Sequence, residues 1–260
     1  MILAKQLRAH SWLRHVEVYP LLGSTSDRAL VVAERSEHEL PALIVAERQT
    51  AGRGRNGRGW WSGEGALAFS LALAPAEMGL APRHWPAMSL ATALAVCDAI
   101  TEAAPGRQVK VKWPNDVLLE GRKAAGVLLE SRRTADGAAD RLVVGIGINV
   151  NNSVSRAPEE LQATSIALCD ATGTTHDRTQ LLLGFVNALR ARAAQLANEE
   201  AELVTAWNER NALAECEVTI QTGDGTLAGR CIDIAPDGSL RIESDGRVVA
   251  CRSGSVVSYR

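Results

Sequence analysis

The sequence predicts an α+β fold, with a mixed β-sheet and covering helices over residues 1–212 and a small β-barrel over residues 213–260. Three observations support this fold class. Apolar strand-like runs and apolar helical faces alternate over the larger part. Short strands separated by Asp-Gly pairs fill the smaller part. The length of 260 residues, of which 46% are hydrophobic and 22% charged, is enough to bury a core.

Two apolar runs at residues 42–46 and 66–73 predict the first strands, which bracket a loop. Residues 89–104 place apolar side chains at three- and four-residue intervals, so they predict a helix with one buried face. An alternating run at residues 109–113 predicts a further strand. Pro114 ends that strand, because proline fixes φ and has no N–H to donate.

Residues 117–119 and 124–129 predict a hairpin, because the Glu-Gly-Arg between them suits a tight turn. Residues 142–150 predict a strand punctuated by glycines. Residues 178–196 follow Asp177, a good N-cap, and repeat apolar side chains at helical spacing, so they predict a helix.

The character of the chain changes after residue 211, where short strands are predicted at residues 218–220, 227–234, 240–243 and 247–251. Asp-Gly pairs lie between them, and glycine accepts the positive φ that tight hairpins need. So many short strands would otherwise leave exposed edges, so they are predicted to close into a small barrel.

Charge, cysteine and histidine usage exclude several functions. The 28 basic and 30 acidic residues give a net charge of −2, so no global attraction to nucleic acid or anionic lipid is expected. The five cysteines lack CxxC spacing and the five histidines form no HxH or HExxH pair, which disfavours a disulfide framework and a metal site. The first twenty residues carry frequent charges, which predicts neither signal peptide nor membrane span, and a cytoplasmic location.

The loop between the first two strands carries the motif GRGRNGRGWW at residues 52–61. Its glycines let backbone amides approach a ligand closely, and its arginine forks bind phosphate or carboxylate oxygens in pairs. The two tryptophans can stack on a flat ring. The loop matches neither the P-loop nor the dinucleotide-binding pattern, so a nucleotide bound here requires another fold. The alternative is a solvated basic loop.

A second motif, KWPND at residues 112–116, ends a strand with a rigid turn. Lys112 offers a point charge for phosphate, Asn115 a donor and an acceptor, and Asp116 a carboxylate for Mg²⁺ or a ribose hydroxyl. A plain strand-ending turn is the alternative.

Two further polar residues lie at the ends of apolar strands. Lys123 opens the run KAAGVLLE, and the hairpin can bring it near Lys112 and the arginine loop, where clustered cations need an anionic ligand. Asn149 follows the glycine-punctuated run GIGI. The alternatives are a solvent-facing lysine and an Asx turn.

Together, GRGRNGRGWW, KWPND, KAAGVLLE and GIGIN, in this order and at this spacing, resemble the catalytic domain of biotin protein ligases. The upstream GSTSD at residues 23–27 is similar to that family's Ser-Thr-Asn motif, with Ser26 where the family usually has Asn. The resemblance extends from about residue 20 to residue 212 and implies a sheet of the class II synthetase and biotin–lipoate ligase type. The terminal β-module is similar to the family's SH3-like C-terminal domain.

The resemblance implies two half-reactions. Biotin and MgATP give biotinyl-5′-AMP and pyrophosphate, and an acceptor lysine of a biotin carboxyl carrier domain then attacks the mixed anhydride. Catalytic roles are expected for Lys123, Arg53 and Arg55. Biotin contacts are expected from Ser24, Thr25, Ser26, Gln49, Gly52, Arg53, Gly54, Arg55, Lys123 and Gly126. ATP contacts are expected from Arg55, Arg58, Trp60, Lys112, Asn115, Asp116 and Asn149. Magnesium would be held through the ATP phosphates, with Asp116 as the candidate protein ligand.

Other functions compete with this one. A lipoate or octanoate ligase shares the fold and the adenylation chemistry, but the arginine loop and KWPND favour biotin. A non-enzymatic nucleic-acid-binding protein would use the Arg-Gly loop and the Trp pair, and the negative net charge disfavours it. The family's bifunctional ligase and repressor needs an N-terminal helix-turn-helix, for which the residues before Ser24 are too few, so no specific DNA binding is expected. A monomer and a homodimer both remain open.

Overall fold

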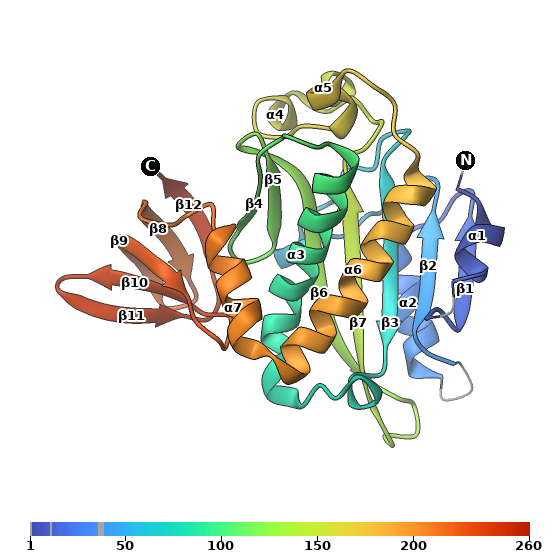
Figure 1. Cartoon of the computed structure of the whole chain (residues 1–260), viewed down its shortest axis with the longest axis horizontal. Helices are drawn as coiled ribbons and strands as arrows, with labels where there is room; N and C mark the ends of the chain where they lie inside the picture. The colour runs from blue at the N-terminus through green and yellow to red at the C-terminus, as the bar shows by residue number, and fades with distance from the viewer. Residues whose placement is uncertain (1, 11, 36–38) are drawn as a thin grey trace.

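The structure, a computed structural model, describes residues 2–10, 12–35 and 39–260. Figure 1 shows a large sheet crossed by long helices, with a smaller sheet from the C-terminal part of the chain standing at one side. The predicted fold class, α+β with a mixed sheet, is confirmed. Among the described residues, no helix has the length and apolar character needed to cross a membrane.

The large sheet has the strand order β1-β2-β3-β7-β6-β5-β4. Its strands are β1 (His15–Tyr19), β2 (Ala42–Ala46), β3 (Leu67–Leu73), β4 (Val109–Lys112), β5 (Asp116–Leu119), β6 (Arg122–Arg133) and β7 (Asp140–Ile148). β1 pairs with β2 in parallel, and the other neighbours pair antiparallel. β2 and β3 are buried along their full length, which explains their uninterrupted apolar sequences.

Helices cover both faces of this sheet. α3 (Trp85–Ala103) and α6 (Arg178–Asn198) pack together across one face and lie in front of the strands in Figure 1. Phe69 of β3 meets Phe185 of α6 edge to face, with 5.0 Å between the ring centroids. α2 (Thr25–Glu34) packs over β2, β3 and β7, where it forms a second apolar cluster with the side chains that alternate to the other face.

The smaller sheet is antiparallel and has the strand order β11-β10-β9-β8-β12. Its strands are β8 (Glu217–Thr222), β9 (Gly225–Ile234), β10 (Leu240–Ser244), β11 (Arg247–Cys251) and β12 (Ser255–Tyr259). Asp245 and Gly246 both have positive φ in the β10–β11 turn, as the Asp-Gly pair predicts. Closure into an SH3-like barrel and the domain boundary between residues 212 and 213 stay predictions.

Several elements lie outside the set that the sequence analysis predicts. They are β1, β12, α1 (Ala4–Arg8), α2, α4 (Glu159–Gln162), α5 (Leu168–Thr172) and α7 (Glu200–Glu209). The helix predicted at residues 89–104 begins earlier, at Trp85, where Pro86 occupies the first turn and His84 precedes it.

Candidate active site

A cavity of about 330 Å³ lies on the large sheet and is lined by residues of β7, β6, β5 and β4. One row of cross-strand partners runs beneath it: Gly147 pairs with Gly126, Gly126 with Asp116, and Asp116 with Lys112. Neighbouring strands lie about 4.8 Å apart, so the row spans about 14 Å. The cavity therefore has two ends, one toward β3 and α2 and the other toward β4.

The end toward β3 carries neutral polar groups. Gln49 Oε1 accepts hydrogen bonds from the backbone N–H of Thr25 at 2.7 Å and from its hydroxyl at 3.1 Å. Ser70 of β3 donates to the Thr25 hydroxyl at 2.8 Å, and its Oγ lies 3.2 Å from that of Ser26. Thr25, Ser26 and Ser70 are all buried, so this network holds hydroxyl and amide groups in fixed positions.

The centre of the floor is made of glycines because an aromatic ring lies on it. A Cβ added at Gly147 would come within 2.2 Å of the Trp60 indole, and one at Gly126 within 3.3 Å. A Cβ at Gly145, which alternates onto the same face of β7, would come within 2.3 Å of Ser26 Oγ. Because these residues have no side chain, the Trp60 indole and the Ser26 hydroxyl can lie directly on the sheet.

The end toward β4 is cationic. Lys123 Nζ lies 2.6 Å from Asp116 Oδ1 and 5.7 Å from the centroid of the Trp60 ring. Burial lowers the pKa of Lys112; the charge of Asp116 opposes this effect, and that of Lys123 adds to it. Two ammonium groups thus share one carboxylate, which leaves excess positive charge for an anionic ligand.

The arginine loop covers this cationic end. Arg55 donates to Asn115 Oδ1 at 3.2 Å, and Asn115 Nδ2 donates to the backbone carbonyl of Val127 at 2.6 Å. Burial lowers the pKa of Arg55, with Asp116 raising it and Arg58 lowering it further. The loop and the KWPND turn are therefore joined through Arg55 and Asn115.

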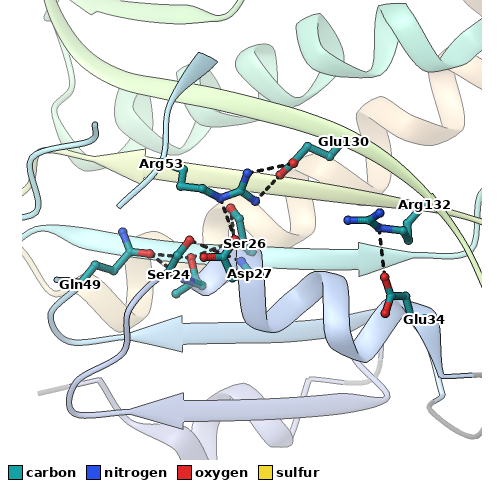
Figure 2. Close-up of polar contacts among 10 residues, drawn as sticks. Ser24, Ser26, Asp27, Glu34, Gln49, Arg53, Glu130 and Arg132 are labelled. Carbon is teal, nitrogen blue, oxygen red and sulfur yellow. Dashed lines mark hydrogen bonds and ion pairs between the residues drawn. The ribbon is translucent and has the colours of Figure 1, made fainter. Parts of the chain in front are cut away.

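Arg53 is turned toward two carboxylates instead. Its guanidinium donates to both oxygens of Glu130, at 3.0 and 2.7 Å, and its Nε lies 2.8 Å from Asp27 Oδ1 (Figure 2). Asp27 belongs to the first turn of α2 and Glu130 to β6. Arg53 therefore fastens the start of the loop to both the helix and the sheet.

The predicted site residues converge, with two exceptions. Those that line the cavity are Thr25, Ser26, Gln49, Arg53, Gly54, Arg55, Arg58, Trp60, Lys112, Asn115, Asp116, Lys123, Gly126 and Asn149. Ser24 does not line it, because its hydroxyl caps α2 by accepting from the N–H of Asp27. Gly52 does not line it either, and a Cβ there would come within 2.7 Å of the Trp60 carbonyl, so this glycine permits the loop to close on itself.

Other lining residues lie outside the predicted set. They are Asn56, Gly59, Trp61, Trp113, Pro114, Val127, Leu128, Gly145, Ile146, Gly147, Val154, Ala157, Leu161, Ser165, Gly254, Ser255 and Val256. The alternation of Gly145 and Gly147 in an apolar strand is a signal for close approach that could have been read from the sequence. Nothing local to the sequence marks the segment from Val154 to Ser165 or the β12 residues, which reach the cavity by tertiary folding.

The protein offers one candidate carboxylate for a metal ion at the cavity, Asp116. No group of three or more His, Cys, Asp or Glu side chains that could hold a metal ion occurs in the described part of the chain. Asp116 lines the cavity at its cationic end. Magnesium commonly binds through one or two carboxylates together with substrate phosphates, so a single aspartate fits an ion that arrives with a nucleotide.

The chain matches known proteins over most of its length. A model of the "Biotin/lipoate A/B protein ligase family" matches residues 20–149. The chain is 32% identical over 255 residues to the biotin--[acetyl-CoA-carboxylase] ligase of Mycobacterium tuberculosis, and the match covers 97% of this chain and 92% of that protein. It is 30% identical to the bifunctional ligase/repressor BirA of Escherichia coli, over 97% of this chain and 77% of that longer protein.

Solved structures agree with these matches. The biotin protein ligase of Aquifex aeolicus in complex with biotin and ATP aligns with a TM-score of 0.80 and 29% sequence identity, covering 95% of this chain and 99% of that one. A mutant of the same ligase, in complex with biotin, aligns with a TM-score of 0.77 and 28% sequence identity, covering 95% of this chain and 98% of that one.

Proposed function

The chain belongs to the biotin/lipoate A/B protein ligase family, and we propose that it is a biotin ligase that uses ATP to join biotin to a lysine of a biotin carboxyl carrier domain. The observation that carries the proposal is the change of chemistry along the cavity. Buried neutral hydroxyl and amide groups stand at the β3 end, where Asp27 and Glu130 balance the charge of Arg53, whereas Lys112, Lys123 and Arg55 stand at the β4 end around the single carboxylate of Asp116.

This gradient suits the two substrates. The ureido ring of biotin is neutral and both donates and accepts hydrogen bonds, so the network of Thr25, Ser26 and Gln49 offers matching partners. ATP brings several negative charges, which the ammonium groups of Lys112 and Lys123 and the guanidinium of Arg55 can balance. The glycine floor between the ends leaves the reacting carboxylate and α-phosphate beside Lys123.

The first step needs no nucleophile from the protein. A carboxylate oxygen of biotin attacks the α-phosphorus of ATP, the bond from that phosphorus to the pyrophosphate oxygen breaks, and biotinyl-5′-AMP and pyrophosphate form. The protein aligns the reactants and stabilises charge on the phosphoryl oxygens, which is the work of Lys123 and Arg55. Magnesium would reach the site on the ATP phosphates, with Asp116 as the protein carboxylate able to hold it.

In the second step the acceptor amine attacks the acyl carbon of biotinyl-5′-AMP. The bond from that carbon to the AMP oxygen breaks, so an amide forms and AMP leaves. The name of the Mycobacterium tuberculosis relative, which specifies acetyl-CoA carboxylase, supports a carboxylase carrier domain as the acceptor.

The test separates the substrate from the acceptor. Exchange of labelled pyrophosphate into ATP should depend on biotin and should be absent with lipoate or octanoate. If lipoate supported exchange and biotin did not, the substrate would be lipoate and the proposal of biotin would be wrong. A purified biotin carboxyl carrier domain should then gain one biotin on its lysine, and a lipoyl domain should gain none.

A further inference from the structure

The last strand of the smaller sheet reaches the cationic end of the cavity. Gly254, Ser255 and Val256 line the cavity beside the KWPND turn. Asn56 of the arginine loop lies within 3.5 Å of the Ser255 hydroxyl. Farther along the same strand, the ring centroid of Tyr259 is 4.8 Å from Lys112 Nζ. β12 therefore contacts both segments that the proposed function assigns to the nucleotide.

The residue that follows β4, Trp113, is held by the turn between β9 and β10 of the smaller sheet. The indole N–H of Trp113 donates to the carbonyl oxygen of Gly238 at 3.0 Å, and Trp113 is almost fully buried. The smaller sheet therefore contacts Lys112 through Tyr259 of β12 and Trp113 through the turn between β9 and β10. Their placement thus depends on a part of the chain about 125 residues away.

The surroundings of the Lys112 ammonium indicate that the contact with the Tyr259 ring stabilises its charge. Lys112 is half-buried, and its burial disfavours the charged form. The charge of Asp116 favours the charged form of Lys112, but its carboxylate is already paired with Lys123 at 2.6 Å. The Tyr259 ring is then an additional source of negative potential, since the face of an aromatic ring attracts a cation within about 6 Å of its centroid.

We propose that Tyr259 is a positioning residue for the nucleotide: its ring holds the Lys112 ammonium in the orientation that meets an ATP phosphate. The inference rests on the proposed function, because it takes Lys112 as an ATP ligand. It extends that function by making the smaller sheet part of the ATP site, while the biotin end of the cavity lies beyond its reach.

Two substitutions at Tyr259 and one control test this role. Tyr259→Leu removes the aromatic face and keeps an apolar side chain, whereas Tyr259→Phe keeps the face and removes the hydroxyl. Val257→Ser is the control, since Val257 is an exposed residue of β12 that does not line the cavity. Calorimetric binding of ATP and of biotin, measured separately, reports on each end of the cavity without turnover.

Tyr259→Leu should raise the Kd for ATP by about three- to tenfold, the range for losing one cation–π contact. Its Kd for biotin should stay within about twofold of the parent. Tyr259→Phe and Val257→Ser should bind both ligands as the parent does. In pyrophosphate exchange, Tyr259→Leu should show the matching rise in KM for ATP and an unchanged KM for biotin.

Three results would overturn the inference: parent-like ATP binding by Tyr259→Leu, equal weakening of both ligands, or loss of ATP affinity in Tyr259→Phe. The first denies the contact any role, the second assigns Tyr259 to packing, and the third assigns the effect to the hydroxyl. Failure of the proposed function would give a different result, because the parent would bind ATP yet show no biotin-dependent exchange. The Kd values of the Tyr259 variants for ATP could still be compared in that case.

Discussion

The ion pair between Lys123 and Asp116 lies between the neutral and cationic ends of the cavity. Lys123 is the first inward residue of β6, and Asp116 is the first residue of β5, so the tight β5–β6 turn brings their strands into register. The two side chains are partly shielded from solvent, at 36% and 24% exposure, which strengthens a charge interaction with a ligand relative to the open surface. A phosphate entering here would meet an ammonium whose position is already set, which is the condition for electrostatic catalysis.

Replacing Lys123 with alanine should reduce biotin-dependent pyrophosphate exchange by about 100-fold or more, because charge stabilisation at the reacting centre is lost. Lys110→Ala, on β4 at the edge of the same sheet but outside the cavity, is the matched control and should exchange at the parental rate. Circular dichroism should be the same for both variants. A near-normal exchange rate in Lys123→Ala would remove Lys123 from the catalytic role.

Replacing Arg53 with glycine should let the adenylate escape. Arg53 joins the loop to Glu130 and Asp27, so its loss frees the segment that covers the intermediate. A charge-assisted contact of this kind corresponds to about tenfold or more in retention. The measurement is biotin on bystander lysines of albumin per mole of ATP consumed, which should rise while adenylate synthesis persists.

The mechanism of that leak can be separated from direct ligand contact. Glu130→Gln keeps Arg53 and weakens its anchor, so it should raise bystander labelling in the same direction, though less. If Arg53 acted by touching the adenylate itself, Glu130→Gln would label bystanders no more than the parent does.

At the scale of elements, β1 and α2 are tied by one carboxylate. Glu17 of β1 accepts from Arg28 of α2 at 2.6 and 2.7 Å, from the Tyr19 hydroxyl at 2.9 Å, and lies 3.0 Å from His15 Nε2. The hydrogen bonds from Arg28 lead in lowering the Glu17 pKa from its usual 4.5 to about 2. This tie fixes the helix whose first turn presents Thr25 and Ser26.

The Glu17 shift predicts how stability depends on pH. The folded carboxylate binds its proton less readily than the unfolded one, so its contribution is complete above about pH 4.5 and is lost as the pH falls toward about 2. The shift corresponds to about 3 kcal/mol as an upper bound, and solvent screening reduces the contribution below that value. Urea unfolding of Glu17→Gln should therefore show a lower free energy at pH 7 and a shallower fall between these pH values than the parent. Parallel curves would rule out Glu17 as the source.

Elements with a local signal could be predicted from the sequence. The β5–β6 hairpin could be predicted because its turn residues, Glu120 and Gly121, both have positive φ, as a tight turn requires. β2 and β3 could be predicted because their apolar runs are too short for helices. β1 and α2 could not be predicted in this way. Glu17 and Arg28 interrupt their apolar patterns, because these two residues contact each other and join the two elements. β12 has no turn pair before it, and its pairing with β8 is antiparallel across more than 30 residues.

The candidate site divides in the same way. The residues of the arginine loop and the KWPND turn, with Asn149, could be predicted because they lie in a glycine-rich loop or at strand ends, where polar groups leave the sheet. The fit of Trp60 onto Gly147 could not, because it depends on which strand lies beside which. The position of Tyr259 over Lys112 is equally non-local.

At the scale of the whole molecule, polar side chains join the smaller sheet to the body. The Asn208 amide of α7 donates to the carbonyl of Ile234 at 3.0 Å and accepts from the N–H of the same residue at 2.9 Å. The chain after α7 also bridges to Val111 of β4 through Asn211. The two Asn208 hydrogen bonds and the Val111–Asn211 bridge join the smaller sheet to the body, and β12 can reach the cavity only while this connection holds.

The strength of that junction can be tested by unfolding. All six tryptophans lie at or before residue 207, so their fluorescence follows the body and, through Trp113, its contact with Gly238, whereas hydrogen exchange of residues 217–259 follows the smaller sheet. In the parent both probes should report one transition at the same denaturant concentration, since coupled sheets unfold together.

Asn208→Ala should separate the two probes. It removes two hydrogen bonds to Ile234, so protection in the smaller sheet should fall by about 1–3 kcal/mol and should be lost before the tryptophan signal changes. Asn198→Ala is the matched control, because the Asn198 amide, like that of Asn208, donates to the carbonyl four residues earlier, but it does so at the end of α6 and away from Ile234. Biotin-dependent exchange by Asn208→Ala should then show a raised KM for ATP, since β12 would hold the loop and Lys112 less often. Coincident transitions in Asn208→Ala, with the free energy of the control, would mean that packing around Trp113 and not Asn208 couples the sheets.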